Sequence, residues 1–459
     1  MHTSSTTPGT WKSGCLNPDR SDGTIGLDSY PTMASSLRAL RPALSSLSRA
    51  SSRTTMAASR AFAPAAALSA GRQIRSFTEG MPHTPVFQLT EEEEMLKESV
   101  SKFSQEVILP KVRDMDEAEA MDKTVLEGLF EQGLMSVEIE EEYGGSGMGF
   151  TSAIVAIEEL ARVDPSNTLV VQAFRKYGSK ALKEKYLPRL ATESCGSFCL
   201  SEPASGSDAF ALQTKAVKKG DGYVINGSKM WITNAMESEI FIIFANINPD
   251  AGYKGITAFI AEKNFPGFSI AKKEKKLGIR ASSTCVLNFD DLYVPKENIL
   301  GEEGQGYKYA IGLLNEGRIG IGAQMTGLAL GAWENAVKYC WNERKQFGRL
   351  IGDNQGMRFQ FAQARLDIEA ARALVYNAAR TKASGANFVM EAAMAKLLAS
   401  QVAGRVSGQA VEWMGGMGFV REGLAEKYWR DSKIGAIYEG TSNIQLETIS
   451  KMLQKQYTN

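Results

Sequence analysis

A carboxylate near the C-terminus of the chain, Glu439, has surroundings that suit a general base. It lies between Tyr438 and Gly440 and shortly before the run 444–453, which has helical spacing, so we expect it in a turn ahead of a helix. Apolar neighbours such as Ile437 would partly desolvate the carboxylate, and desolvation raises the pKa of an acid toward the range useful for proton abstraction. The alternative is a solvated acid that is stabilised by the positive end of the following helix.

Composition effectively excludes catalysis by histidine. The 459 residues include two histidines, His2 and His83, which leaves no Ser-His-Asp triad or His-rich metal site to build. The five cysteines are an odd number without a C-x-x-C pair, which indicates buried thiols in a reducing compartment. Catalysis therefore has to use carboxylates or a bound cofactor.

The two common glycine-rich nucleotide motifs are absent from the sequence. No G-x-G-x-x-G follows an expected strand, and no G-x-x-x-x-G-K-[ST] occurs. The candidate for holding a cofactor is the stretch 198–208, whose small and hydroxyl side chains leave backbone N–H groups open to an anionic or carbonyl-bearing ligand. An ordinary loop capped by Ser and Asp would explain the same stretch.

Hydrophobic periodicity divides the body of the chain into three zones that would position these residues. Residues 88–193 are helical in pattern, with Thr90 placed to cap the acidic turn 91–94. Residues 194–300 favour strands, and residues 301–459 are helical again. We therefore expect an α+β fold with an N-terminal helical domain, a central β domain and a C-terminal helical bundle.

Local patterns refine these zones. Asn226-Gly227 is typical of a hairpin turn between strands over 223–225 and 230–232, and Ser442 with Gln445 fits a capping box at the last helix. Further strands are expected over 239–245, over 255–262, and along the alternating Cys285, Leu287 and Phe289. Two buried helical stripes are expected, one formed by Phe361, Ala364, Ile368, Ala371, Val375 and Ala378, the other by Ala395, Ala399, Ala403, Val406 and Ala410.

Residues 1–78 have the composition of a mitochondrial presequence. No acidic residue occurs over 29–78, where arginines are scattered among serines and alanines, and Met33 would open an ordinary presequence. Processing is expected near Phe77, which leaves a body with a slight excess of acidic residues. That balance argues against a nucleic-acid partner, and no apolar run approaches the roughly 18 residues of a membrane span.

Six stretches follow one another in order over nearly all of the chain beyond the presequence. They are 198–208, Trp231-Ile232-Thr233, Asn315-Glu316-Gly317-Arg318, 343–348, 412–416 and 438–443. Together they resemble the acyl-CoA dehydrogenases. Two further stretches, 277–285 and 306–312, are most similar to the short/branched-chain (2-methylbutyryl-CoA) members of that family.

The resemblance implies an FAD enzyme with a C-terminal four-helix bundle, which oxidises a short or branched-chain acyl-CoA thioester to 2-enoyl-CoA. Glu439 matches the family's base, which takes the α-proton while the β-hydrogen leaves as hydride to the flavin, and hydrogen bonds to the thioester carbonyl would stabilise the developing enolate. By the same match, the FAD site would comprise Phe198, Cys199, Leu200, Ser201, Glu202, Pro203, Ala204, Ser205, Gly206, Ser207, Trp231, Ile232, Thr233, Arg344, Gln355, Glu412, Trp413, Met414, Gly415, Gly416, Thr441, Ser442 and Asn443. The acyl-CoA site would comprise Ser207, Tyr253, Tyr307, Asn315, Glu316, Gly317 and Arg318.

The resemblance also implies a homotetramer in the mitochondrial matrix that is reoxidised by electron-transferring flavoprotein. Two departures from the family pattern stand out. Between Asp164 and Gly178 the chain is shorter by about two helical turns, in a region that walls the acyl pocket of relatives. Between Gly331 and Arg344 it is about one residue longer, which would rotate the rest of the helix by about 100° unless a π-bulge absorbs the extra residue.

Three rival interpretations stay open. An acyl-CoA oxidase would share the fold, but such enzymes are normally longer and often end in a peroxisomal signal that this sequence does not carry. Another short-chain dehydrogenase subtype is a nearer alternative, although isovaleryl-type members carry the base on a different element. A non-catalytic assembly protein on the same fold is the alternative from another class, and the presence of Glu439 and Arg318 counts against it.

Overall fold

The computed structural model describes residues 88–166 and 172–458. The expected presequence, both histidines and Cys15 lie outside these residues, as does the middle of the shortened segment between Asp164 and Gly178. The other four cysteines are free and buried, as expected. Within the described part of the chain, no helix is long and apolar enough to cross a membrane, and no group of His, Cys, Asp and Glu side chains is arranged to hold a metal ion.

The N-terminal part is helical and begins at the expected residue. The Thr90 hydroxyl accepts the Glu93 amide at 3.2 Å, and the Glu93 carboxylate accepts the Thr90 amide at 2.9 Å, which confirms the cap on α1 (Glu91–Phe103). The glycine-rich stretch 143–149 is the turn that leads into α4 (Phe150–Ala161). The other helices of this part are α2 (Val112–Ala118), α3 (Lys123–Glu131), α5 (Gln172–Tyr177) and α6 (Lys180–Thr192).

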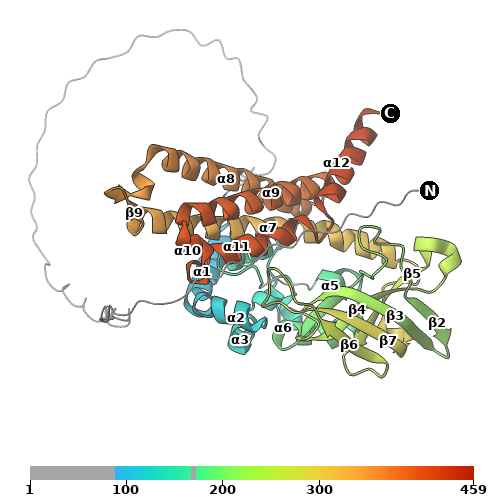
Figure 1. The fold of residues 1–459 in the computed structure, drawn as a ribbon. Coiled ribbons are helices and arrows are strands. Elements are labelled where there is room, and N and C mark those ends of the chain that lie inside the picture. The colour runs from blue at the N-terminus through green and yellow to red at the C-terminus, as the bar shows by residue number, and fades with distance from the viewer. Residues whose placement is uncertain (1–87, 167–171, 459) are drawn as a thin grey trace, which may run out of the picture. The chain divides into compact units, whose positions relative to one another are not determined.

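The middle of the chain forms one sheet that lies below the long helices and beside α6 in Figure 1. Its strands run in the order β6-β7-β3-β2-β4-β5-β8, and β1 pairs parallel to β4. The strands are β1 (Cys195–Cys199), β2 (Lys215–Lys219), β3 (Gly222–Thr233), β4 (Ser238–Asn246), β5 (Ile256–Glu262), β6 (Phe268–Lys273), β7 (Thr284–Pro295) and β8 (Ile299–Leu300). The strands expected over 239–245 and 255–262 are confirmed as β4 and β5, and along β7 the alternating Cys285, Leu287 and Phe289 are buried.

The hairpin turn expected at Asn226-Gly227 is wrong, because β3 continues through both residues. The Asn226 side chain donates to the Asp291 carboxylate at 2.9 Å, and the pairing with β7 shifts register there. A side chain on Gly227 would come within 2.6 Å of Thr214, so glycine is required by a close approach inside a strand. The turn between β2 and β3 lies at Gly220, whose φ is +63°.

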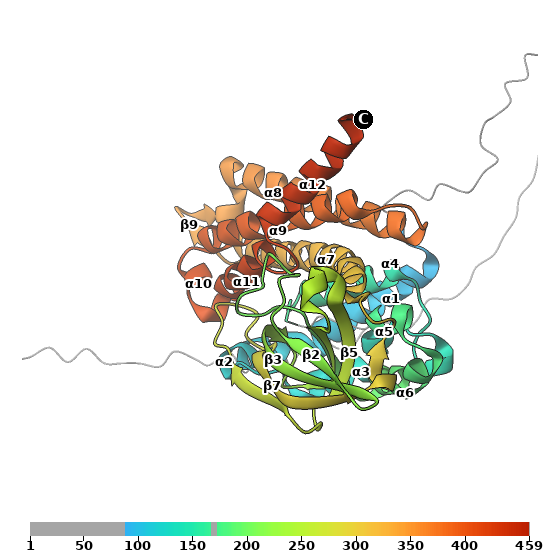
Figure 2. The ribbon, with the colours of Figure 1, turned by 90° about the vertical axis from the view of Figure 1, so that its right-hand side faces the viewer.

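The C-terminal part is a bundle of long helices, seen from two directions in Figures 1 and 2. The helices α7 (Gly306–Asn342), α8 (Gln355–Ala383) and α9 (Val389–Met414) pack on one another, and α12 (Ser442–Tyr457) starts beside α9 and projects outward. The shorter α10 (Gly416–Phe419) and α11 (Ala425–Ser432) lie between α9 and α12 in the sequence. Both expected stripes, on α8 and α9, are buried in the core, which confirms them and the α+β class. The helix α7 is regular throughout, so no π-bulge absorbs an extra residue before Arg344.

Candidate active site

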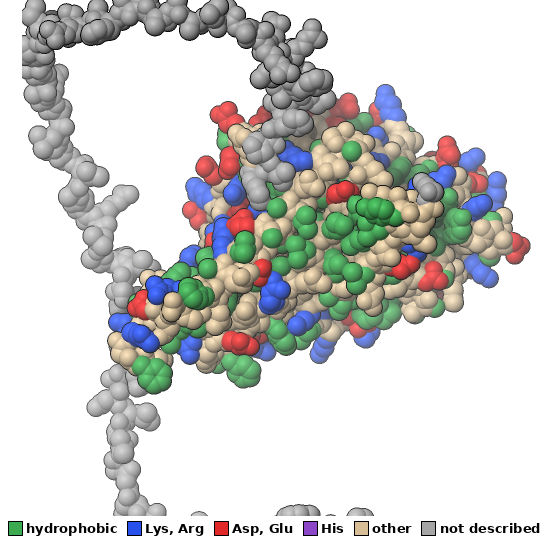
Figure 3. Space-filling model, turned by 90° about the horizontal axis from the view of Figure 1, so that it is seen from above, with side chains coloured by type: hydrophobic (Ala, Val, Ile, Leu, Met, Phe, Trp, Pro, Cys, Tyr) green, Lys and Arg blue, Asp and Glu red, His purple; other side chains and the backbone are tan. Residues whose placement is uncertain are grey.

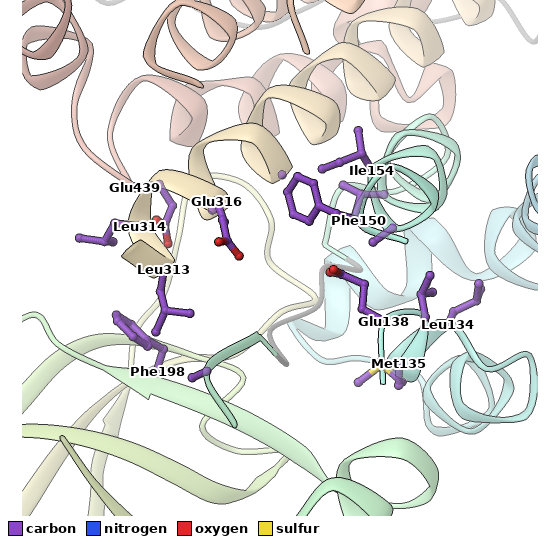
Figure 4. A pocket seen from close by; sticks show the side chains of 16 residues that line it. Leu134, Met135, Glu138, Phe150, Ile154, Phe198, Leu313, Leu314, Glu316 and Glu439 are labelled. Carbon is purple, nitrogen blue, oxygen red and sulfur yellow. The ribbon is translucent and has the colours of Figure 1, made fainter. Parts of the chain in front are cut away.

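A cavity of about 150 Å³ lies between α7, α4, β1 and the 3₁₀ turn Leu134–Ser136. Figure 4 shows that Glu439 and Glu316 enter it from the side of α7, while Glu138 faces them from the opposite wall. The remaining lining is mostly apolar: Leu134, Met135, Val137, Phe150, Ala153, Ile154, Ile157, Ala173, Phe198, Leu313, Leu314, Gly317 and Gly320. Such a cavity suits an apolar chain with a reactive group at one end.

Glu439 lies in a tight turn between the 3₁₀ helix Lys433–Ala436 and α12, in agreement with the sequence-based expectation. Its φ is +52° and that of Gly440 is +85°, so two successive residues are left-handed, a conformation that costs free energy at a glutamate. The Gln445 side chain bonds both carbonyl oxygens, at 3.0 Å to Glu439 and 2.8 Å to Gly440. These contacts hold the turn in a fixed position ahead of α12.

The cap of α12 differs from the one expected. The Thr441 hydroxyl accepts the Ile444 amide at 3.3 Å, so Thr441 is the N-cap and the predicted Ser442–Gln445 capping box is wrong. Thr441 and Ser442 are adjacent and both are good cap residues, and the Gln445 amide is used by the Glu439 turn instead. The shift by one residue leaves Glu439 outside the helix.

The Glu439 carboxylate is enclosed without being fully paired. Its Oε2 atom is buried and has no hydrogen-bond partner, and it faces Gly317, where a Cβ atom would come within 2.7 Å. Burial raises the pKa of Glu439 to about 7, although the positive charges of Arg318 and Lys396 oppose the rise. This agrees with the desolvated carboxylate and not with the solvated acid, and it leaves a lone pair free to accept a proton.

Two cations from different helices face this carboxylate. Arg318 on α7 donates to the Asn315 side chain at 2.9 Å, while its Nε atom is buried without a partner and burial lowers its pKa. Lys396 on α9 is 0% exposed, donates from Nζ to the Gly440 carbonyl at 2.7 Å, and has its pKa lowered by burial to about 8. Lys396 was not identified from the sequence, where the only sign is a lysine within the small-residue stripe of α9.

The residues expected at the acyl-CoA site lie along α7 and beside it. The rings of Tyr253 and Tyr307 meet edge to face at 4.8 Å, and Ser207 is exposed. Asn315 and Glu316 are buried on α7, and Gly317 faces the carboxylate of Glu439. The structure therefore brings the glutamate and the α7 residues together.

The two other carboxylates of the cavity, Glu316 on α7 and Glu138 on the opposite wall, lie next to cations. The Glu316 carboxylate pairs with Lys176 and lies 3.7 Å from Lys382, and Glu138 lies 3.8 Å from Lys382 and 3.4 Å from Arg175. Burial raises the pKa of Glu138 above its usual range. Because Glu316 and Glu138 are held in these ion pairs, Glu439 is the better-placed proton acceptor.

One part of the expected FAD site lies around the end of β1 and on β3. The Glu202 carboxylate is tied inward by Lys229 at 2.7 Å and by the Gln213 amide at 2.6 Å, and Cys199, Leu200 and Ser205 are also buried. Ser201, Pro203, Ala204, Gly206 and Ser207 are half-buried or exposed. On β3, Trp231 has a φ of +64° and is 55% exposed, and Thr233 is exposed while Ile232 is buried. The loop after β1 thus presents backbone outward, and β3 presents a large aromatic side chain.

Most of the other part lies at the end of the bundle, next to α10 and to the hairpin of β9 (Lys345–Gln346) and β10 (Arg349–Leu350), away from the sheet in Figures 1 and 2. Arg344 donates to the Trp413 carbonyl and packs on Gly415, where a Cβ atom would come within 2.7 Å of the guanidinium. Gln355, Glu412 and Gly416 are exposed, while Met414 is buried. Thr441, Ser442 and Asn443 lie at the start of α12. A single chain therefore does not gather the expected FAD residues in one place.

Comparison with known proteins agrees with this architecture. Three family models match in order: the acyl-CoA dehydrogenase N-terminal domain over 90–194, the middle domain over 197–292 and the C-terminal domain over 304–454. The mitochondrial short/branched chain specific acyl-CoA dehydrogenase of Rattus norvegicus is 51% identical over 381 residues, which cover 81% of this chain and 88% of the relative.

Two solved structures are also similar. Butyryl-CoA dehydrogenase from Megasphaera elsdenii is 41% identical with a TM-score of 0.78, covering 80% of this chain and 99% of its own. A glutaryl-CoA dehydrogenase from Mycobacterium smegmatis in complex with FADH2 is 25% identical with a TM-score of 0.75, covering 80% of this chain and 95% of its own. This chain therefore belongs to the acyl-CoA dehydrogenase family.

Proposed function

We propose that this protein is an FAD-dependent dehydrogenase that converts short or branched-chain acyl-CoA thioesters to 2-enoyl-CoA, with Glu439 as the base. The observation that carries the proposal is the buried, unpartnered Oε2 atom of Glu439 at one end of an apolar cavity. A carboxylate whose pKa is about 7 is largely ionised at slightly alkaline pH and strong enough to remove a weakly acidic proton. The similarity to the rat enzyme supports the short and branched acyl class.

The chemistry assigns a task to each part of the cavity. The apolar lining would hold the acyl chain and exclude water, so that the α-carbon lies next to Glu439. Proton removal would proceed to the Oε2 atom, while hydrogen bonds to the thioester oxygen stabilise the developing enolate. FAD, when bound, would accept the β-hydrogen as hydride.

The residues present fit an FAD that is held without a Rossmann motif. Trp231 offers an exposed aromatic face beside the loop that follows β1, and Arg344 offers a cation over a glycine that leaves room for it. Trp231 lies on strand β3 of the sheet, whereas Arg344 lies beside the β9–β10 hairpin at the end of the bundle. The Mycobacterium smegmatis relative supports the choice of flavin.

The separation of the two features supports a homotetramer in which a second copy completes the FAD site. Phe347, at the tip of the β9–β10 hairpin beside Arg344, is 100% exposed, and Phe419 on α10 is 81% exposed. Seen from above, the bundle carries further apolar side chains on its outer surface (Figure 3). Exposed aromatic side chains next to half of a ligand site are the expected interface of an obligate oligomer.

We also propose electron-transferring flavoprotein as the oxidant of the reduced flavin and the mitochondrial matrix as the location. The support for the partner is membership of the family. The support for the location is the arginine-rich, acid-free composition over 29–78 together with the mitochondrial relative.

The test is anaerobic reduction of the purified, flavin-loaded enzyme by a panel of acyl-CoA thioesters. We expect the flavin absorbance to bleach with 2-methylbutyryl-CoA and butyryl-CoA, and far more slowly with palmitoyl-CoA, because the cavity is small. Failure of every acyl-CoA to bleach the flavin would contradict the proposal and favour a non-catalytic role. Fast reoxidation by air alone would favour an oxidase.

A further inference from the structure

The turn that carries Glu439 and the 3₁₀ helix just before it are each held to α9 by one polar contact. Lys396 donates to the Gly440 carbonyl at 2.7 Å, and four residues later the Ser400 hydroxyl donates to the Gly435 carbonyl at 2.8 Å. Both side chains are buried in the bundle core. A helix in that core therefore sets the position of the turn from the side opposite Gln445.

Burying a lysine to make the hydrogen bond to Gly440 costs more free energy than burying a neutral donor would. Removing an ammonium group from water costs several kcal/mol, whereas a neutral donor such as an amide or hydroxyl could make the same hydrogen bond at about a third of that cost or less. Burial accordingly lowers the pKa of Lys396 to about 8. The energetic cost indicates that the positive charge of Lys396 has a use of its own.

The role of the Lys396 charge follows from the other charged and titratable groups around the Glu439 turn. Arg318 from α7 and Lys396 from α9 face Glu439, and α12 contributes only the neutral Gln445. Tyr438 donates to Gln324, and its pKa is raised by burial and by Glu439, so it stays neutral. The negative charge of Glu316 is offset by Lys176 and Lys382. Glu439 therefore faces two cations, and α9 supplies one of them through Lys396.

We infer that Lys396 is a positioning residue for proton abstraction, whose hydrogen bond holds the left-handed Glu439–Gly440 turn and whose charge keeps the Glu439 carboxylate ionised. This inference rests on the proposed role of Glu439 as the base. Lys396 Nζ binds the carbonyl of the residue next to Glu439, and its positive charge opposes the rise that burial causes in the pKa of Glu439. Without that charge, a larger fraction of Glu439 would be protonated at neutral pH and unable to accept the α-proton.

The test compares the pH dependence of kcat/KM in Lys396→Gln, Lys396→Met and Ser400→Ala with that of the unaltered enzyme. Gln retains a donor for the Gly440 carbonyl without the charge, and Met removes both. We expect the acid limb of kcat/KM to move upward by about 1 unit or more in both Lys396 variants, with activity recovering at high pH. Ser400→Ala removes a neutral hydrogen bond to Gly435, just before the same turn. The acid limb of kcat/KM in this variant should therefore stay in place.

A second readout separates the hydrogen bond from the charge. Hydrogen–deuterium exchange over 435–445 should increase in Lys396→Met and stay near the original level in Lys396→Gln. An unmoved acid limb in folded, flavin-loaded Lys396→Gln would overturn the inference. If Glu439→Gln is inactive while that limb is unmoved, only the role of Lys396 fails; if Glu439→Gln is active, the proposed function itself fails.

Discussion

The turn that carries Glu439 is held by contacts from α7, α9 and α12, whereas the residues expected to hold FAD lie in three places: the loop after β1 with β3, the start of α12, and the end of the bundle around Arg344. Around Glu439, contacts from α7, α9 and α12 converge on two residues. Arg344 and Gly415, in contrast, lie at the end of the bundle beside β9 and α10, whereas Trp231 lies on strand β3 of the sheet. The fold of one chain positions the proposed base, whereas the proposed FAD site would be completed only when a second copy of the chain assembles with the first.

This difference predicts that the two regions respond differently to substitution. Changes at the Glu439 side chain should alter the chemical step with little effect on flavin content and oligomer size, because the backbone of its turn is held by Lys396 and Gln445 and not by the carboxylate. Changes near Arg344 should alter flavin retention and assembly together.

Glu439→Gln should abolish turnover while the flavin stays bound, which is the largest effect we expect. Gln is nearly isosteric with Glu and can keep the left-handed turn, but its amide cannot accept the α-proton. We expect bleaching of the flavin by 2-methylbutyryl-CoA to slow by roughly 10² to 10⁴-fold under anaerobic conditions. Glu447→Gln, which changes an exposed glutamate of α12, is the control and should bleach normally. Bleaching at the original rate in Glu439→Gln would send the search to Glu316.

Gly317→Ala should impair catalysis without lowering stability. The added Cβ atom would come within 2.7 Å of the Glu439 Oε2 atom, and the carboxylate at the end of a flexible side chain would move in response. Because small displacements of a catalytic group are costly, we expect kcat to fall by about tenfold or more. Gly404→Ala, on α9 with no atom within 4 Å of the new Cβ, is the matched control for an added methyl group in a helix. Equal kcat in both variants would show that the position of Oε2 is not critical.

Arg344→Ala should weaken flavin retention by about tenfold and leave the acid limb of any remaining activity in place. A charge-assisted hydrogen bond to an anionic group contributes about 1.5 to 3 kcal/mol. Flavin content and oligomer size after gel filtration measure the effect, with Arg349→Ala, an exposed arginine of the same hairpin, as the control. Full flavin content in Arg344→Ala would show that the end of the bundle does not contribute to FAD binding, and would contradict the difference proposed between the two regions.

The turn at Glu439 could be predicted from the sequence because its signals are local. Helical spacing after residue 443 and the neighbouring glycine fix a turn before α12, and burial of the carboxylate followed from its apolar neighbours. The prediction of a hairpin turn at Asn226-Gly227 is wrong because Gly227 is needed where β3 packs closely against Thr214. That packing cannot be recognised from the local sequence pattern. Lys396 could not be identified because a lysine on a helix is ordinarily solvent-exposed, and its burial follows from the bundle.

The expected FAD residues illustrate a different limit. Their identities came from the resemblance, and the sequence carries no sign of which of them share a location. Only the three-dimensional arrangement shows that Arg344 lies at the end of the bundle beside β9, whereas Trp231 lies on strand β3 of the sheet. An interface between subunits cannot be recognised from a local sequence pattern. The exposed Phe347 indicates such an interface only once the structure shows that it lies beside Arg344.

The most direct test of the role of Glu439 isolates proton abstraction from flavin reduction. Acetyl-CoA has α-hydrogens but no β-hydrogen, so an enzyme that carries the base can exchange its α-protons with solvent without oxidising it. The flavin-loaded enzyme in D₂O should therefore place deuterium on the acetyl group, as measured by mass spectrometry, and Glu439→Gln should do so at least about 100-fold more slowly. Equal deuterium incorporation by the two proteins would contradict Glu439 as the base.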